Sequence, residues 1–280
     1  MNKIIFNGKF VDEGTPIVSS ASRGLRFGDG CFETMKLVKA KLVLKELHFE
    51  RLFSSLETLG FKIPKHFSAD EFEKQIIDLA TKNGHQQMGR IRVTFFGSNG
   101  GLYDAESQIP NYILESFELS STLGTFNDNG LVIDIFKDAR KAADNFSHIK
   151  TNSFLPYVQA ANWAKRNQLN DAIVLNAFDR VADTTISNLF IVSDGIIKTP
   201  ALDEGCISGV MRKYLLQCCR KEGLPIEETQ IAVDELLNAN EVFLTNAIRG
   251  IKWVKQVGVA GYSFKTSALL YKKFIKPLFQ

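Results

Sequence analysis

The sequence predicts a mixed α/β protein with two domains, and three observations lead to this prediction. Segments with the two-residue hydrophobic period of strands alternate with segments that have the helical period. The chain has 280 residues, more than one ordinary small domain needs. Residues 120–129 are rich in Ser, Thr, Gly, Asn and Asp, a composition typical of linkers. We therefore expect an N-terminal domain over residues 1–119, a linker over 120–129 and a C-terminal domain over 130–280.

The expected first domain combines a hairpin, two helices and further strands. The Asn-Gly pair at 7–8 separates two short apolar runs, which is a hairpin signal. A stripe of leucines predicts a helix over residues 47–59, before a glycine. Ser68, with Glu71 three residues later, has the capping-box pattern and predicts a second helix that runs to about residue 83. Strands are expected over residues 4–6, 9–11, 41–44, 90–96 and 111–119.

The expected second domain repeats this mixture. Helices are predicted over residues 153–168, 208–222 and 266–279, and Gly223 and Pro225 stop the second of them. A short turn at 193–195 joins two apolar runs into a hairpin. Strands are expected over residues 131–136, 171–175, 189–192, 196–198 and 241–245.

Composition narrows the class of protein. The net charge is only +3, and Lys and Arg are spread along the chain, whereas a nucleic-acid-binding protein usually carries a basic stripe. No apolar run is long enough for a membrane span, and the first residues lack the apolar core of a signal peptide. The four cysteines have no CxxC spacing, and no Cys/His cluster suggests a metal site. We expect a cytoplasmic protein without nucleic-acid or membrane partners and without a metal.

Three local features suggest chemistry. Residues 205–212 open a helix, where backbone N–H groups can hold a phosphate. Residues 183–188 form a polar run directly before an apolar strand, and Lys150 lies between a strand region and a helix. Taken singly, these features also fit helix capping or an ordinary surface lysine. The Gly-Asp-Gly sequence at 28–30 is only a fragment of a dinucleotide fingerprint, without its third glycine and a preceding buried strand, and such a fragment is more often a tight turn.

Five motifs in order strengthen the functional interpretation. They are the segments 23–34 (RGLRFGDGCFET), 48–52 (HFERL), 149–151 (IKT), 182–190 (ADTTISNLF) and 205–212 (GCISGVMR). In this order and at these separations the chain resembles the class IV, or fold-type IV, enzymes that use pyridoxal 5'-phosphate. That family includes branched-chain and D-amino-acid aminotransferases and 4-amino-4-deoxychorismate lyase.

The resemblance implies a two-domain fold with the active site between the domains, a homodimer, and a small-molecule amine as substrate. It implies that Lys150 carries the cofactor as a Schiff base and that Arg51 binds the cofactor phosphate. It also implies that Asp183 pairs with the pyridine nitrogen, a carboxylate role that keeps the ring protonated as an electron sink. The phosphate-binding turn would include Ile207, Gly209, Val210 and Met211.

Two positions depart from the family pattern. The family usually has glutamate where this chain has Asp183, so the carboxylate here is one methylene shorter. Such a carboxylate either reaches the ring nitrogen through a shifted backbone or a water, or holds it less firmly than glutamate does. Met211 stands where relatives often carry a hydroxyl residue, so only its backbone amide is able to donate to the phosphate.

Two segments favour a lyase within the family. Phe32-Glu33-Thr34 resembles the Phe-x-Thr ending of the lyases, and residues 245–250 (TNAIRG) resemble their Asn-Ser-Leu-Arg-Gly segment. The implied reaction converts 4-amino-4-deoxychorismate to 4-aminobenzoate and pyruvate, a step of folate biosynthesis. Lys150 and Thr34 would move protons, and Arg249 would pair with a substrate carboxylate. The alternatives are an aminotransferase for D- or branched-chain amino acids, and a catalytically impaired protein that only binds the cofactor.

Overall fold

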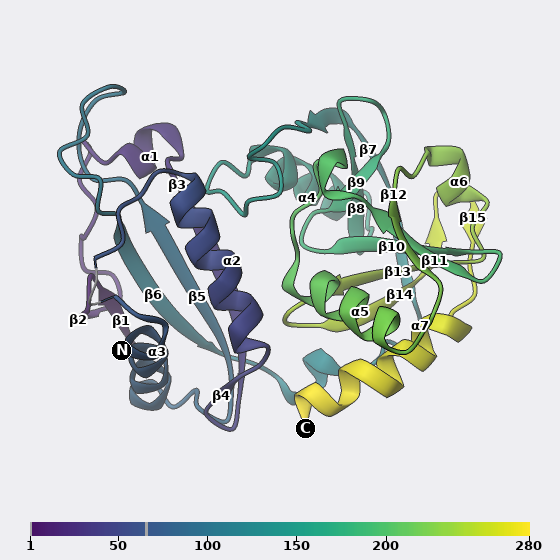
Figure 1. Ribbon diagram of the computed structural model, residues 1–280, viewed down its shortest axis with the longest axis horizontal. Helices are drawn as coiled ribbons and strands as arrows, with labels where there is room; N and C mark the ends of the chain where they lie inside the picture. Colours follow the sequence, from purple (N-terminus) through teal and green to yellow (C-terminus); the bar gives the residue numbers. More distant parts are fainter. Residues whose placement is uncertain (1, 65–66) are drawn as a thin grey trace. The chain divides into compact units, whose positions relative to one another are not determined.

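The computed structural model describes residues 2–64 and 67–280, which divide into two compact units (Figure 1). The first unit is Met1–Leu123 with Lys150–Ser153, and the second is Gly124–Ile149 with Phe154–Gln280. The division after Leu123 lies within the segment expected to be a linker, and the predicted domain bounds stay a prediction. The grouping of Lys150 differs from the expected placement in the C-terminal domain, because backbone hydrogen bonds join Lys150–Ser153 to the first unit.

The first unit is built on a six-stranded antiparallel sheet in the order β2-β1-β6-β5-β3-β4. The predicted hairpin and helices are present, whereas β3 and the short α1 were not predicted. The strands are β1 (Lys3–Phe6), β2 (Lys9–Asp12), β3 (Gly30–Val38), β4 (Lys41–Leu42), β5 (Met88–Phe96) and β6 (Asn111–Glu118). The helices are α1 (Arg23–Phe27), α2 (Lys45–Thr58) and α3 (Ala69–Lys82), followed by the 3-10 turn Ser121–Gly124.

Helices α2 and α3 pack on this sheet through aromatic side chains. Phe72 of α3 is fully buried and contacts Phe49 of α2 and Phe95 of β5, with ring centroids 6.2 and 6.1 Å apart. The predicted cap of α3 is confirmed, since Ser68 Oγ accepts a hydrogen bond from the Glu71 N–H at 3.2 Å. Phenylalanine, of which the chain has 22, therefore supplies much of this core.

The second unit contains a nine-stranded mixed sheet. The main path runs β12-β11-β10-β13-β14-β7-β8-β9, and β15 pairs with β14. The predicted strands and the hairpin β10–β11 are present, whereas β9, β12, β14 and β15 were not predicted. The strands are β7 (Leu131–Lys141), β8 (Asp171–Asn176), β9 (Val181–Thr184), β10 (Asn188–Ser193), β11 (Ile196–Pro200), β12 (Ile226–Thr229), β13 (Glu241–Asn246), β14 (Gly250–Val257) and β15 (Ala260–Gly261).

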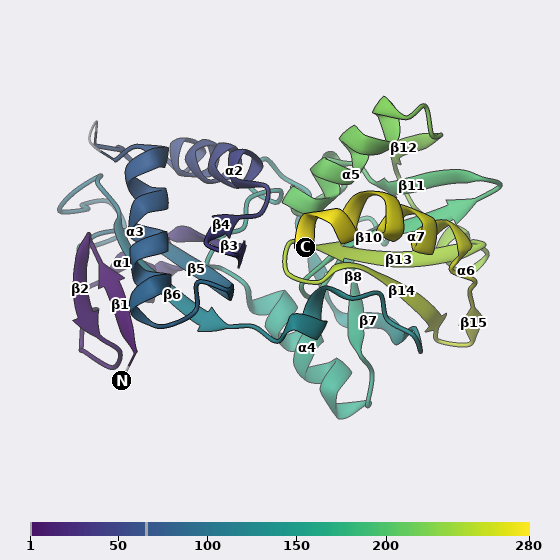
Figure 2. The same cartoon turned by 90° about the horizontal axis from the view of Figure 1, so that it is seen from below.

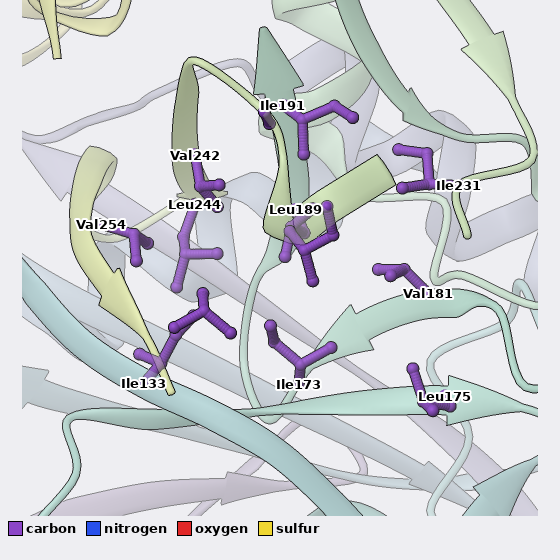
Figure 3. Close-up of a cluster of buried hydrophobic side chains, with 13 residues drawn as sticks. Ile133, Ile173, Leu175, Val181, Leu189, Ile191, Ile231, Val242, Leu244 and Val254 are labelled. Carbon is purple, nitrogen blue, oxygen red and sulfur yellow. The ribbon is translucent and has the colours of Figure 1, made fainter. Parts of the chain in front are cut away.

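The sheet of the second unit curves around an apolar core (Figure 3). Val181 of β9 and Leu189 of β10 belong to the same buried cluster as Val242 of β13 and Val254 of β14. The two outer strands β8 and β9 therefore face the middle of the sheet across this core. Apolar burial of this kind is the main stabilising contribution to folding.

The described residues of the second unit form four α-helices. They are α4 (Leu155–Arg166), α5 (Val210–Lys221), the short α6 (Val233–Leu237), which was not predicted, and α7 (Lys265–Leu270). Helix α5 and the C-terminal segment lie side by side in Figures 1 and 2, joined by a hydrogen bond from Tyr214 Oη to the Phe274 carbonyl at 3.3 Å. Helix α4 packs elsewhere, on β7 and β8.

The C-terminal helix is less regular than predicted. A single helix was expected over residues 266–279, but α7 is followed by a π-helical turn at Tyr271–Ile275 and a 3-10 turn at Lys276–Phe279. Pro277 gives the physical reason, because proline lacks an N–H and its ring clashes with the carbonyl four residues earlier. None of the helices in the described part of the chain has the length and apolar character needed to span a bilayer.

Candidate functional site

The segment 23–34 folds as a short helix, a tight turn and a strand. Helix α1 ends at Gly28, whose φ of 67° is left-handed. Asp29 Oδ2 accepts a hydrogen bond from Arg23 Nε at 2.8 Å, and this ion pair closes the turn. The Gly-Asp-Gly sequence at 28–30 therefore forms a tight turn that leads into β3. This is the structural alternative given for this sequence above.

Backbone hydrogen bonds fix the position of the Lys150 main chain in the first unit. The Phe32 N–H donates to the Lys150 carbonyl at 2.9 Å, and the Asn152 N–H donates to the Gly30 carbonyl at 2.9 Å. Asn152 Nδ2 also donates to the Phe95 carbonyl at 2.8 Å. A Cβ at Gly30 would lie 2.1 Å from the Phe95 carbonyl oxygen and 2.5 Å from Asn152 Nδ2. Glycine is therefore required for this close approach.

Lys150 and Thr34 lie on one side of the first unit's sheet. Phe32 and Thr34 share a face of β3, because successive side chains of a strand point to opposite faces. Lys150 Nζ lies 4.3 Å from the centroid of the Phe32 ring. Arg92, opposite Thr34 in β5, places its guanidinium carbon 4.1 Å from the centroid of the same ring, and burial lowers its pKa. Two cations and a hydroxyl thus gather around Phe32.

Glu33 points to the opposite face, toward α2, and is buried there with two basic side chains. Arg51 Nε donates to Glu33 Oε2 at 2.8 Å, and a second guanidinium nitrogen bonds Oε1. His48 Nδ1 lies 3.0 Å from Oε1, and the Thr34 N–H donates to the same oxygen at 2.9 Å. Burial alone would raise the pKa of Glu33, but the charges and hydrogen bonds of Arg51 and His48 hold it well below its usual range.

The pairing with Glu33 sets the orientation of Arg51. A two-point contact between a guanidinium and a carboxylate fixes the plane of both groups. Arg51 was predicted to bind a phosphate, and the contact with Glu33 uses two of the five N–H donors of a guanidinium. Glu33 is therefore a functional candidate that the sequence interpretation missed, although it lies between Phe32 and Thr34 of a motif that was recognised.

Asp183 is the centre of a buried polar cluster in the second unit. Its Oδ2 accepts hydrogen bonds from the Ile207 N–H at 2.8 Å, Tyr157 Oη at 2.9 Å and Lys141 Nζ at 3.3 Å. Its Oδ1 accepts one from Asn188 Nδ2 at 2.9 Å. Burial raises the pKa of Asp183, whereas Lys141, the Ile207 amide and Tyr157 lower it. Burial also raises the pKa of Tyr157 well above its ordinary value, so the phenol donates.

The start of α5 offers backbone donors next to this cluster. The first i→i−4 bond of the helix runs from the Lys213 N–H to the Gly209 carbonyl, so the amides of Val210 and Met211 precede the intrahelical ladder. A Cβ at Gly209 would lie 1.8 Å from Asn188 Oδ1, so only glycine fits there. Asn188 in turn donates to the Ile207 carbonyl at 2.7 Å and thereby links this turn to Asp183.

Thr245 adds an unsatisfied hydroxyl on the same side. It is the cross-strand partner of Asn188, so the two side chains share a face. Its Oγ1 is buried and has no hydrogen-bond partner among the described residues. A buried hydroxyl without a partner costs free energy, which indicates a place for a further polar group.

Arg249, the predicted carboxylate-binding residue, lies in the turn between β13 and β14. Asn246 Oδ1 accepts hydrogen bonds from the N–H groups of Ile248 at 3.1 Å and Arg249 at 2.7 Å. This turn fixes the Arg249 backbone and leaves its side chain exposed.

The structure thus gathers the predicted site residues in two places. The first unit brings together Lys150 and Thr34, and holds Arg51 on the other face of β3. The second unit brings together Asp183 and the turn that contains Ile207, Gly209, Val210 and Met211. The described residues contain no group of three or more His, Cys, Asp and Glu side chains suited to a metal. The sequence interpretation missed Lys141, Tyr157 and Arg92, which carry no local motif.

Comparison with known proteins identifies the family. The sequence model described as "Amino-transferase class IV" matches residues 30–257. The chain belongs to the class IV aminotransferase family. Enzymes of this class depend on pyridoxal phosphate, and this chain has their mixed α/β fold, fold-type IV.

Relatives within class IV carry out different reactions. The aminodeoxychorismate lyase of Bacillus subtilis is 26% identical over 98% of this chain and 94% of its own. The D-alanine aminotransferase of Listeria monocytogenes is 25% identical over 99% of this chain and 96% of its own. The branched-chain aminotransferase of Thermoproteus uzoniensis, solved with norvaline, has a TM-score of 0.87 at 22% identity and covers 99% of this chain and 95% of its own.

The residues of this class IV enzyme fit pyridoxal phosphate. The buried carboxylate of Asp183 suits a protonated ring nitrogen. The amides at the start of α5 and the unpaired Thr245 hydroxyl suit a phosphate. Met211 lacks the hydroxyl often found at its position in the family, and its side chain is buried in the protein.

The Glu33 cluster predicts a pH-dependent contribution to stability. Glu33→Gln should lower the free energy of unfolding at pH 7 by about 3 kcal/mol, because it breaks a buried ion pair. The folded-state pKa is depressed. The contribution is therefore full above the unfolded pKa of about 4.3 and is lost as the pH falls toward the folded value. Urea unfolding from pH 7 downward measures this, with the exposed Glu57→Gln as control. A difference of the same size for both variants would contradict the assignment.

Proposed function

We propose that this class IV enzyme is a 4-amino-4-deoxychorismate lyase, which forms 4-aminobenzoate and pyruvate in folate biosynthesis. The observation that carries the proposal is the position of Thr34. Thr34 shares a face of β3 with Phe32, and Lys150 Nζ lies 4.3 Å from the centroid of the Phe32 ring, so Thr34 and Lys150 lie on the same side of the first unit's sheet. A proton donor on the same side as the catalytic amine is what an elimination needs, in addition to the base.

The proposed roles follow from the chemistry of each side chain. Bound pyridoxal phosphate supplies an electron sink for the substrate carbon that bears the amine. Lys150 Nζ is the attachment point and the base that removes the proton from that carbon. Thr34 Oγ1 gives a proton to the departing three-carbon fragment as the remaining ring becomes aromatic. Arg249 pairs with a substrate carboxylate.

Other residues hold the cofactor in the proposed site. Arg51 and the amides of Val210 and Met211 bind the phosphate, since a guanidinium fork and a helix start both favour an anion. The Ile207 and Gly209 amides, which were also expected there, already donate to Asp183 Oδ2 and to the Ile207 carbonyl, so these two residues shape the turn. Asp183 holds a proton at the ring nitrogen, which keeps the ring positively charged. The Glu33 carboxylate orients Arg51 by its two-point contact.

The relatives support the lyase and also define its rival. The lyase of Bacillus subtilis matches nearly the full length of this chain, but so does the D-alanine aminotransferase of Listeria monocytogenes. The rival is therefore an aminotransferase for D- or branched-chain amino acids. It would use Lys150 in the same way but transfer the amine to a keto acid. A third possibility, a protein that only binds the cofactor, is disfavoured by the retention of Lys150, Arg51 and a carboxylate at Asp183.

We further propose that the enzyme is a cytoplasmic homodimer. The resemblance implies a dimer, and a two-fold axis is the commonest closed symmetry of soluble oligomers. The thiols of Cys31, Cys206, Cys218 and Cys219 are unpaired, and three of them are buried, which suits a reducing compartment. Light scattering of the purified holoenzyme gives the molar mass, and a value near 31.4 kDa would contradict the dimer.

Product analysis tests the reaction. The purified holoenzyme with 4-amino-4-deoxychorismate should give 4-aminobenzoate and pyruvate in equal amounts. With amino acids and 2-oxoglutarate it should give no glutamate. Formation of glutamate without 4-aminobenzoate would establish the aminotransferase instead. A protein that binds the cofactor and forms neither product would be the impaired binder. Lys150→Ala is the control for uncatalysed breakdown of the substrate.

The attachment site of the cofactor is predicted to be Lys150. Borohydride reduction of the holoenzyme, followed by peptide mapping, should place the pyridoxyl label on Lys150 alone. The backbone contacts with Phe32 and Gly30 hold this lysine in a defined position, whereas Lys141 of the second unit is engaged by Asp183. A label on any other lysine would overturn the assignment.

Arg51 is predicted to bind the cofactor phosphate. Arg51→Ala should weaken binding of pyridoxal phosphate to the apoprotein by about 1.5–3 kcal/mol, the range for a hydrogen bond to a charged group. Because Arg51 also pairs with Glu33, the thermal stability of each variant is measured alongside. The exposed Arg26→Ala, on α1, is the control. Unchanged cofactor affinity in a folded Arg51→Ala protein would reject the role.

A further inference from the structure

The two oxygens of Asp183 are used unequally. Oδ2 receives three donors, from Ile207, Tyr157 and Lys141, whereas Oδ1 receives one, from Asn188. A carboxylate oxygen offers about two acceptor sites. Oδ2 is therefore saturated by the protein, and Oδ1 has capacity for one further donor.

Lys141 reaches Asp183 because β7 contains an irregularity. The pairing of β7 with β8 passes from Phe136, opposite Val174, directly to Arg140, opposite the next residue, so three residues of β7 are out of register. Val174 is also the partner of Asp183 in β9. The extra residues bend the strand and place Lys141 on the same side of the sheet as Asp183.

Tyr157 reaches the same oxygen from α4. The helix packs on β7 and β8 through an apolar cluster that includes Phe136, Ala160 and Val174. Tyr157 belongs to this cluster and is 5% exposed, with its ring 4.3 Å from that of Phe154. The ring of Tyr157 packs in this apolar cluster, and its hydroxyl donates to Asp183 Oδ2. Lys141 Nζ lies 5.2 Å from the centroid of the Tyr157 ring, so the two donors also contact each other.

This environment acts on the charge of Asp183 in two opposite ways. Asp183 is 2% exposed, and removal from water favours the neutral acid. The Lys141 charge and the phenol favour the ionised form. Cys206 is a further titratable group whose charge would interact with that of Asp183. The pKa of the Cys206 thiol is raised to about 12, mainly by burial and also by the charge of Asp183. Cys206 is thus neutral, and Lys141 is the cation that contacts the carboxylate directly.

We propose that Lys141 and Tyr157 are positioning residues that hold Asp183 as a carboxylate and direct its Oδ1 to the pyridine nitrogen of the cofactor. The inference rests on the proposed role of Asp183 as partner of that nitrogen. It explains how a side chain one methylene shorter than glutamate serves there. Three donors anchor Oδ2, so the orientation of the short carboxylate is set by the protein. The positive charge of Lys141 keeps the shared proton on the ring nitrogen and off Asp183.

The test measures in the holoenzyme, without turnover, whether the ring nitrogen of the cofactor carries the proton that it shares with Asp183. The enzyme is reconstituted with pyridoxal phosphate labelled with ¹⁵N in the ring, whose chemical shift distinguishes a protonated from an unprotonated nitrogen. In Lys141→Met the carboxylate attracts the shared proton more strongly, and the signal should move toward the unprotonated position. Tyr157→Phe should move it in the same direction by less. Lys141→Arg, which keeps the charge, should restore the signal.

Matched variants separate this effect from a change in folding. Lys137→Met removes an exposed lysine from the same strand, and Tyr262→Phe removes a hydroxyl that donates to the Leu236 carbonyl, so both should leave the signal unchanged. The cofactor dissociation constant should rise about tenfold in Lys141→Met, the scale of one charge-assisted hydrogen bond. If Lys141→Met does not fold, Tyr157→Phe and Lys141→Arg decide the question.

Asp183→Asn separates the proposed role of Asp183 from its positioning by Lys141 and Tyr157. If Asp183→Asn leaves the ring signal at its original position, the proposed role of Asp183 itself is wrong. If Asp183→Asn moves the signal but folded Lys141→Met and Tyr157→Phe do not, Asp183 keeps its role and the positioning by Lys141 and Tyr157 is refuted. Equal movement in Lys137→Met would also refute it.

Discussion

Removing a carboxylate from water costs several kcal/mol unless other groups replace the lost hydration, and this constraint shapes both units of the protein. In the first unit Glu33 is buried on the face of β3 that faces α2, and it orients the side chains of His48 and Arg51 on that helix. In the second unit Asp183 draws donors from β7, α4, β10 and the turn before α5. In each unit, elements that are distant in the sequence are thereby joined by hydrogen bonds to a single carboxylate, Glu33 or Asp183. The site's polar geometry is consequently part of the fold and does not wait for a ligand to create it.

The difference between the two clusters is instructive. Glu33 is balanced by a bidentate arginine, and its charge is strongly favoured. Asp183 has a lysine at 3.3 Å and three neutral donors, and burial still raises its pKa. The proposed role of Asp183 is to stay ionised beside a protonated ring nitrogen, and the charge of Lys141 favours that ionised form. Glu33 is compensated by the two-point contact with Arg51, which fits a purely orienting role.

Local sequence signals predicted much of the fold. Some features depend only on residues close together in the chain, so the sequence predicts them directly. They are the hairpin at Asn7, the cap at Ser68 and the hairpin at 193–195. Strand β3 was missed because both of its faces are largely buried, and Lys36 and Glu33 interrupt any apolar alternation. Strand β9 was missed because Asp183 and Thr184 made it look like a polar connector. In each strand one of these polar residues, Glu33 or Asp183, belongs to the candidate site.

The candidate site was predictable to the extent that it lies in contiguous motifs. Lys150, Arg51 and Asp183 each stand in a segment that resembles the family. Lys141 and Tyr157 do not, because their function depends on an irregular strand and on helix packing that bring them to Asp183 from distant positions. Such contacts are set by tertiary structure, and one sequence contains no local pattern for them.

The brief return of the chain to the first unit at Lys150–Ser153 has a consequence for biosynthesis. A ribosome completes residues 1–123 well before it reaches Lys150, yet the N–H of Phe32 and the carbonyl of Gly30 find their partners only in that later segment. The first unit therefore cannot complete its folding before the residues that follow it have been synthesised. The strand that leads to Thr34 keeps open backbone groups until part of the second unit has been made. Unpaired strand groups of this kind promote association between chains. Premature termination between the two units would leave a fragment with an incomplete sheet, and the nascent chain passes through that same state each time it is synthesised.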